Sequence, residues 1–136
     1  MSLFNWGEKY HTGVNSIDLQ HKKLFDLINN LHEAIVDKKN EPLALKETLD
    51  NLILYTQNHF IYEENLLSEN NFPGAEKHFL EHEKLCNELE QFIRKFQKGE
   101  LKDTMELLNF TIEWLQYHIL ESDKKCGRFL SDRGVK

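Results

Sequence analysis

The chain has 136 residues, enough for one domain with a buried core and too few for two substantial domains. Its 23 acidic and 17 basic residues give a formal net charge of −6, which disfavours nucleic acid and anionic membrane surfaces as partners. A hydrophobic content of 40% with only two prolines excludes a disordered chain. We therefore expect residues 1–136 to form a single globular domain.

Targeting signals and cysteine pairs are both missing from the sequence. It contains no apolar stretch of about 18 residues and no N-terminal secretory pattern, so we expect a cytoplasmic protein without membrane insertion. Cys86 and Cys126 lie too far apart for a paired metal motif, and we expect both to be reduced. Seven histidines are the unusual feature of the composition, because histidine is a common metal ligand.

Hydrophobic residues recur at helical spacing in four segments joined by short connections. The second segment is predicted to start at an N-cap provided by Asn40, with Pro42 in its first turn. The predicted helices cover about residues 17–37, 41–68, 74–98 and 102–121, between an N-terminal arm (1–16) and a C-terminal tail (124–136). Short connections force neighbouring helices to run antiparallel, so the prediction is an all-α, up-down-up-down four-helix bundle.

Polar residues interrupt the apolar stripes at matching depths on the second and third helices. His59 and Glu63 lie 12 and 8 residues before Asn71 in the intervening turn, and His78 and His82 lie 7 and 11 residues after it. At a rise of about 1.5 Å per residue, the two pairs reach the same level of the bundle. Residues four apart share one helix face, so each pair points in one direction.

The first and fourth helices bring further polar residues to this level. His21 lies near the start of the first helix, and His118 lies near the end of the fourth. Asp123 follows His118 by five residues, about 140° away around an ideal helix, so both can face inward only if the helix loosens or ends near residues 121–122. His32 lies about 16 Å along the axis from His21 and cannot reach this level.

Five imidazoles and two carboxylates within an apolar core indicate a metal site. Without metal, each buried polar group would need a hydrogen-bond partner or would cost several kcal/mol. Seven ligands exceed the four of a structural zinc site and suit two six-coordinate ions that share carboxylates. Ligand type narrows the metal to iron, manganese or cobalt. The predicted metal ligands are His21, His59, Glu63, His78, His82, His118 and Asp123.

These segments resemble the hemerythrin family, in its single-domain bacterial form, over nearly the whole chain. The matching motifs are Gly13-Val14 with IDLQH ending at His21, HFIYEE from His59, HFLEH from His78, and WLQYHILESD ending at Asp123. The resemblance implies two iron ions (Fe²⁺/Fe³⁺) with an oxo or hydroxo bridge. His78, His82 and His118 would hold one iron, His21 and His59 the other, and Glu63 and Asp123 would bridge them.

The resemblance also implies a function that is not enzymatic: reversible dioxygen binding for oxygen storage, transport or delivery. The residues that match the family's oxygen pocket are Phe60, Trp114, Leu115 and Ile119. We therefore expect dioxygen as the ligand, with nitric oxide as a further candidate and an unidentified oxygen-using protein as a candidate partner.

Other interpretations of these motifs remain as alternatives. HFLEH also matches the H-x-x-E-H pattern of zinc peptidases, but Glu81, which would be the base, is expected to face away from the other ligands. Ferritin-like oxidases use four glutamates and two E-x-x-H motifs, and only Glu8-x-x-His11 fits that pattern. A di-iron oxidase or peroxidase, and a sensing or iron-holding protein, are the alternatives in function.

Overall fold

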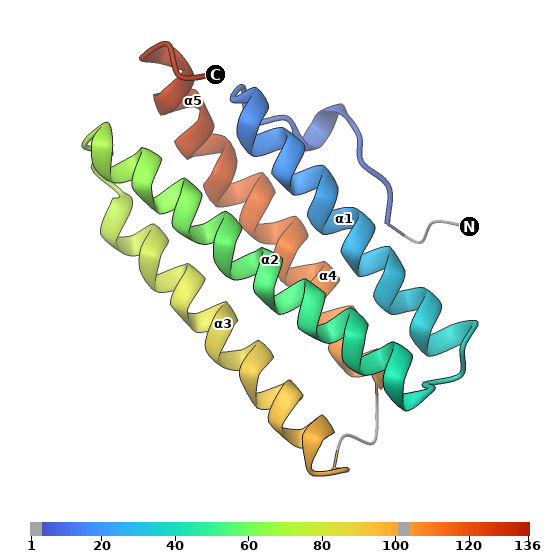
Figure 1. Ribbon diagram of the computed structural model, residues 1–136. Helices are drawn as coiled ribbons and strands as arrows, with labels where there is room; N and C mark the ends of the chain where they lie inside the picture. The colour runs from blue at the N-terminus through green and yellow to red at the C-terminus, as the bar shows by residue number, and fades with distance from the viewer. Residues whose placement is uncertain (1–3, 101–103) are drawn as a thin grey trace.

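The computed structural model describes residues 4–100 and 104–136, and every regular element in these ranges is helical (Figure 1). The elements are η1 (Glu8–Tyr10), α1 (Asn15–Val36), α2 (Pro42–Glu69), α3 (Ala75–Gln97), α4 (Thr104–Tyr117), η2 (His118–Asp123) and α5 (Lys124–Asp132). They confirm the predicted up-down-up-down four-helix bundle. Its four helical rods are α1, α2, α3 and the continuous stack of α4, η2 and α5. Residues 1–3 of the predicted arm and 102–103 of the fourth predicted helix lie outside the described residues.

The fourth rod passes the site through a π-helical segment and then continues as a helix. In η2 the backbone N–H of Lys124 donates to the carbonyl of Ile119, five residues earlier, as a π turn requires. The loosening predicted near residues 121–122 therefore occurs. The prediction of a tail from residue 124 is wrong, because the π turn changes the helical register without ending the helix, and Leu130 of α5 is fully buried.

The turn between α1 and α2 also differs from the sequence prediction. Glu41, and not Asn40, caps α2: its carboxylate accepts hydrogen bonds from the backbone N–H groups of Leu43 and Ala44 at 3.1 and 2.8 Å. Asn40 instead has a φ of 60° and accepts a hydrogen bond from the hydroxyl of Thr104 at 2.8 Å. A glutamate carboxylate thus satisfies the orphan N–H groups that a shorter asparagine side chain was predicted to reach.

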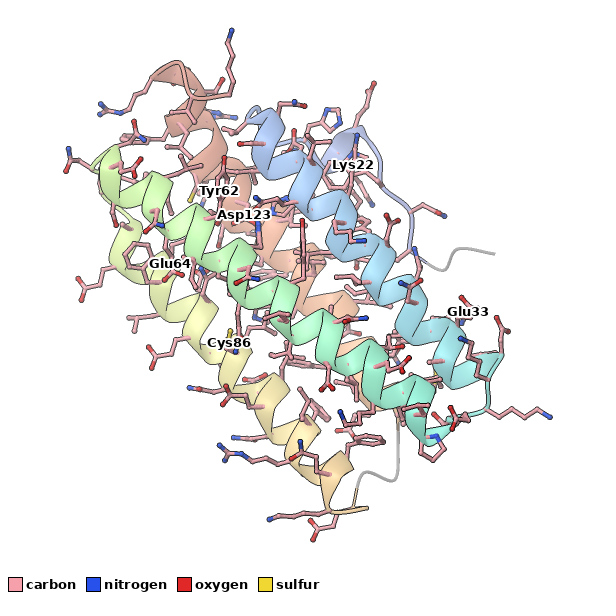
Figure 2. The ribbon with its side chains drawn as sticks, in the orientation of Figure 1. Lys22, Glu33, Tyr62, Glu64, Cys86 and Asp123 are labelled. Carbon is pink, nitrogen blue, oxygen red and sulfur yellow. The ribbon has the colours of Figure 1, made fainter. Side chains whose placement is uncertain are left out.

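Two hydrophobic clusters fill the bundle, one on each side of the level at which the predicted metal ligands lie. The smaller cluster is formed by residues nearest the α2–α3 turn, and its buried members are Val14, Ile17, Leu67, Cys126 and Leu130. The larger cluster fills the rest of the bundle. Figure 2 shows Asp123 inside the half of the bundle nearest that turn, whereas Glu33 lies toward the opposite end. None of the helices within the described residues is long and apolar enough to cross a membrane.

The N-terminal arm packs against α5 at a point where only glycine fits. Thr12 is fixed by its backbone N–H and its hydroxyl, which both donate to Asp18 Oδ1 at 2.9 Å. A Cβ atom on Gly127 would lie 2.2 Å from the backbone oxygen of Thr12. The close approach of arm and helix therefore depends on the missing side chain of Gly127.

We predict that Gly127→Ala destabilises the protein. Alanine gains about 1 kcal/mol over glycine inside a helix. Overpacking against a backbone atom costs about 3 kcal/mol, because rotating a side chain cannot relieve it. We expect a net loss of about 2 kcal/mol in the free energy of unfolding, measured by urea denaturation.

Gly7→Ala is the matched control, since a Cβ atom on Gly7 meets nothing within 4 Å. Its free energy of unfolding should stay within about 0.5 kcal/mol of the parent. Equal stability of the two variants would show that the arm does not pack on α5 as described.

Candidate metal centre

The seven predicted ligands come together from all four rods of the bundle. They form two overlapping groups. Each residue of a group offers one possible ligand atom, and these atoms all lie within 4.8 Å of one another. The three-histidine group consists of His78, His82 and His118 with Glu63 and Asp123. The two-histidine group consists of His21 and His59 with the same two carboxylates. Neither group contains His32, as its depth along the first helix predicted.

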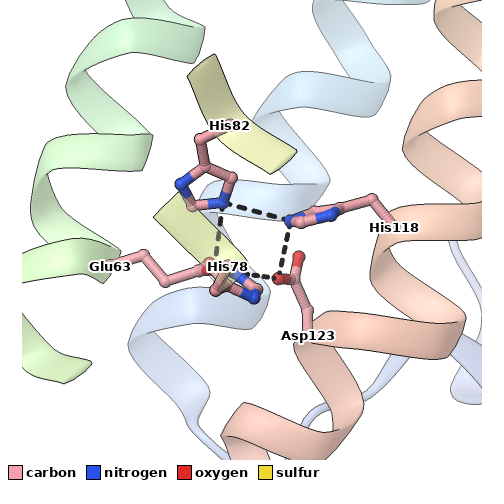
Figure 3. Close-up of side chains that lie close together, drawn as sticks. All are labelled: Glu63, His78, His82, His118 and Asp123. Atoms are coloured by element: carbon pink, nitrogen blue, oxygen red, sulfur yellow. Dashed lines mark hydrogen bonds and ion pairs between the residues drawn. The ribbon is translucent and has the colours of Figure 1, made fainter. Parts of the chain in front are cut away.

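Glu63 lies between the two groups and offers one oxygen to each. Its Oε1 contacts the Nε2 atoms of His78 and His82, the latter at 3.5 Å (Figure 3). Its Oε2 lies 3.2 Å from Nε2 of His59 and 3.8 Å from Nε2 of His21. The carboxylate is therefore oriented to bridge two positions.

Asp123 is oriented in the same way from the opposite side. Its Oδ1 lies 3.1 Å from the Nε2 atoms of both His78 and His118, and its Oδ2 lies 3.0 Å from Nε2 of His21. This orientation depends on the π turn, because η2 begins at His118 and ends at Asp123. A residue five positions after His118 on an ideal α-helix would point about 140° away.

The donor set fits metal ions better than it fits an apolar core. No side chain of the seven is more than 3% exposed. Nonetheless, several inward-facing atoms have no hydrogen-bond partner: Nε2 of His21, Nε2 of His59, Oε2 of Glu63, and both carboxylate oxygens of Asp123. Such orphaned buried atoms cost free energy unless something binds them. Imidazole nitrogens and carboxylate oxygens are the donors that divalent transition metals prefer.

Electrostatics keep both carboxylates ionised despite their burial. Burial and the charge of Asp123 oppose ionisation of Glu63, but close contacts with His59, His78 and His82 outweigh them and hold the pKa of Glu63 well below its usual range. Burial also opposes ionisation of Asp123, and the neighbouring histidines, His118 foremost, hold its pKa well below the usual value. Two negative charges are thus fixed between the histidine groups.

The two negative charges and burial shift the pKa values of the histidines in different directions. Burial lowers the pKa of His78, but its close contacts with Asp123, Cys126 and Glu63 raise it to about 12. Burial is the largest influence on His59 and holds its pKa below the usual value, despite the close contact with Glu63.

Four of the five outward-facing Nδ1 atoms have a polar neighbour that sequence reasoning missed. Glu81 does turn away from the inner cluster, as predicted, but it does not turn to solvent alone: its Oε2 lies 3.0 Å from Nδ1 of His118. The four pairs of outer partner and ligand are Gln20 with His59 (2.6 Å), Glu64 with His82 (3.7 Å), Glu81 with His118 (3.0 Å) and Cys126 with His78 (3.4 Å). Three of the partners directly adjoin a ligand in the sequence, which is the signal that could have identified them.

Two of the four residues predicted to line an oxygen pocket, Phe60 and Trp114, stack on imidazoles of the three-histidine group. Phe60 is buried and stacks on the ring of His82, with centroids 3.7 Å apart. Trp114 is half-buried and stacks on the ring of His118 at 4.4 Å. Leu115 and Ile119 are buried, with 5% and 0% exposure. Phe60 also lies near the two-histidine group, with its ring centroid 5.8 Å from that of His59. The role of the four residues as a ligand pocket remains a prediction.

Comparison with known proteins identifies the family. The model of the hemerythrin HHE cation binding domain matches residues 12–130. The bacteriohemerythrin of Methylococcus capsulatus is 32% identical over 132 residues, which cover 96% of this chain and 99% of the relative. That of Clostridium acetobutylicum is 30% identical over 129 residues, covering 90% and 98%.

Solved structures agree with the sequence comparisons. A crystal structure of wild-type hemerythrin is 32% identical to this chain, with a TM-score of 0.89, and the match covers 95% of this chain and 98% of the other. A leucine-to-alanine variant of hemerythrin matches with a TM-score of 0.90 at 31% identity, over 96% of this chain and 99% of the other. The family model spans all seven side chains of the cluster. This chain belongs to the hemerythrin family.

Proposed function

We propose that this chain binds dioxygen reversibly at a di-iron centre and serves in oxygen storage, transport or delivery. The observation that supports the proposal best is the orientation of the two carboxylates, each of which offers one oxygen to each histidine group. The hemerythrin family binds dioxygen at a di-iron centre. The chain supplies the donors that two neighbouring ions need.

The two groups differ in the number of donors, and this difference creates room for a ligand. His78, His82 and His118 would hold one iron together with an oxygen from Glu63 and one from Asp123. His21 and His59 would hold the other iron with the remaining carboxylate oxygens, one nitrogen fewer. When bound, iron supplies the electrons that dioxygen binding withdraws and that its release returns. The two-histidine group would therefore hold the iron that has fewer protein ligands and can take up dioxygen.

The side chains around the cluster restrict water. Phe60, Leu115 and Ile119 are buried, and Trp114 covers one face of His118. An apolar surrounding slows the entry of water and protons, which promote irreversible oxidation. These residues thus favour release of the same dioxygen molecule that was bound.

The number of anionic ligands also favours binding over oxidation chemistry. The cluster contains two carboxylates and five histidines, whereas ferritin-like oxidases use four glutamates and two histidines. Fewer anionic donors stabilise ferric ions less. A centre built in this way holds dioxygen more readily than it cleaves it.

Two iron ions per chain and a reversible visible spectrum are the expected results for the purified protein. Metal content is measured by elemental analysis after loading with ferrous iron. The reduced protein is then exposed to air, and the visible absorption band that forms should disappear when oxygen is removed. Irreversible bleaching would support an oxidase instead, and one zinc ion per chain with peptidase activity would support a peptidase.

Removing either shared carboxylate should disrupt both halves of the centre. We predict that Glu63→Ala and Asp123→Ala retain one iron per chain or fewer and lose the reversible band, because each carboxylate contacts both groups. His32→Ala is the matched control and should retain two irons, since His32 belongs to neither group. Loss of iron from the His32 variant would contradict the assignment of the ligands.

A further inference from the structure

The outer partners of the ligand imidazoles are distributed unevenly between the two groups. In the three-histidine group, Nδ1 of His118 lies 3.0 Å from a carboxylate oxygen of Glu81. Nδ1 of His82 lies 3.7 Å from one of Glu64, which is within ion-pair distance but too long for a hydrogen bond. The third histidine, His78, has only the thiol of Cys126 as its outer partner. Two carboxylates therefore face the outer side of this group.

Among the described residues, no carboxylate is paired with an outer nitrogen of the two-histidine group, although the charge of the buried Asp18 also acts on His21. Nδ1 of His59 lies 2.6 Å from Oε1 of Gln20, a neutral amide. Nδ1 of His21 is buried and has no hydrogen-bond partner. The nearest aromatic ring outside the cluster is that of Trp6, with its centroid 6.3 Å from that of His21. Of the residues that the structure describes, carboxylates paired with an outer Nδ1 atom are thus found on the three-histidine group only.

We propose that Glu81 and Glu64 are positioning residues that make the three-histidine group the tighter-binding and more electron-donating half of the centre. This inference rests on the proposed function. It adds the outer carboxylates to the difference that the number of histidines already makes between the two metal positions.

The physical basis is the hydrogen bond across the imidazole ring. When Nε2 faces a metal, Nδ1 carries the proton and donates it to the outer partner. A carboxylate acceptor draws this proton more strongly than an amide does, which raises the basicity of Nε2 and fixes the ring orientation. The group with carboxylate partners therefore donates more charge to its metal and favours the higher oxidation state.

Glu81 is the better placed of the two carboxylates. Its Oε2 accepts a hydrogen bond from the hydroxyl of Ser122 at 2.7 Å, which holds it against His118. Its side chain is 30% exposed and that of Glu64 is 31% exposed, so solvent screens their long-range field. The effect of Glu81 on His118 is therefore carried by the local hydrogen bond between them. Glu81→Gln tests this effect, because glutamine keeps the shape of the side chain and removes the negative charge of the acceptor.

Zinc titration against a chromophoric chelator tests the inference without redox chemistry. The parent should bind two zinc ions in two distinguishable steps. We expect Glu81→Gln to weaken one step about 10-fold, the lower end of the usual effect of losing such a partner. Glu64→Gln should weaken the same step less, because its contact is longer.

A reciprocal variant and a charge-matched control complete the titration. Gln20→Glu places a carboxylate behind His59 and should tighten the step that Glu81→Gln leaves unchanged. Glu83→Gln removes the same charge from an exposed position on α3 and should alter neither step. If Glu81→Gln and Gln20→Glu both change the affinity of the same zinc-binding step, the two residues do not act on separate metal positions. That result would overturn the inference.

The reduction potential of the iron-loaded protein gives a readout that a purely structural role would not shift. Glu81→Gln should raise the reduction potential, because His118 then donates less charge to the ferric ion. The melting temperature of the metal-free variant should equal that of the metal-free parent. An unchanged potential would overturn the inference. Fewer than two zinc ions bound to the parent chain would instead overturn the proposed function itself.

Discussion

The structure depends on placing five imidazoles and two carboxylates at one level of an apolar bundle. The four rods supply these side chains, none of them more than 3% exposed. A hydrophobic cluster lies on either side, so a shift of any helix along its axis would move a polar group into apolar surroundings. The register of all four rods is therefore fixed by the same requirement that creates the site.

The π-helical segment shows how strongly this requirement acts on the backbone. An uninterrupted α-helix could direct either His118 or Asp123 inward, but not both. The wider turn of η2 directs both and lets α5 continue in the same direction. Packing of α5 against the N-terminal arm, through Gly127 and Thr12, then holds the segment beyond the site in place. The irregular turn is stable because ordered structure flanks it on both sides.

The sequence predicted the fold and the convergence of the seven side chains because both follow from periodicity. Spacing of four residues puts His59 with Glu63 and His78 with His82, and equal distances from the turn put the two pairs at one depth. The α5 helix and the Glu41 cap were missed because Lys124, Lys125 and Gly127 resemble a helix end and glutamate is an uncommon N-cap. Periodicity carries no information on which residue of a neighbouring helix meets an outward-facing nitrogen.

The outer partners connect the assembly of the bundle with the chemistry of its centre. Gln20 on α1 contacts His59 on α2, and Glu64 on α2 contacts His82 on α3. Each of these partners adjoins a ligand of its own helix, and a rotation of about 100° per residue turns it toward the next helix. Correct packing of two helices thus orients the imidazole of one with a side chain of the other. A change at a helix contact therefore alters ring orientation and ligand basicity, even where all seven inner side chains are preserved.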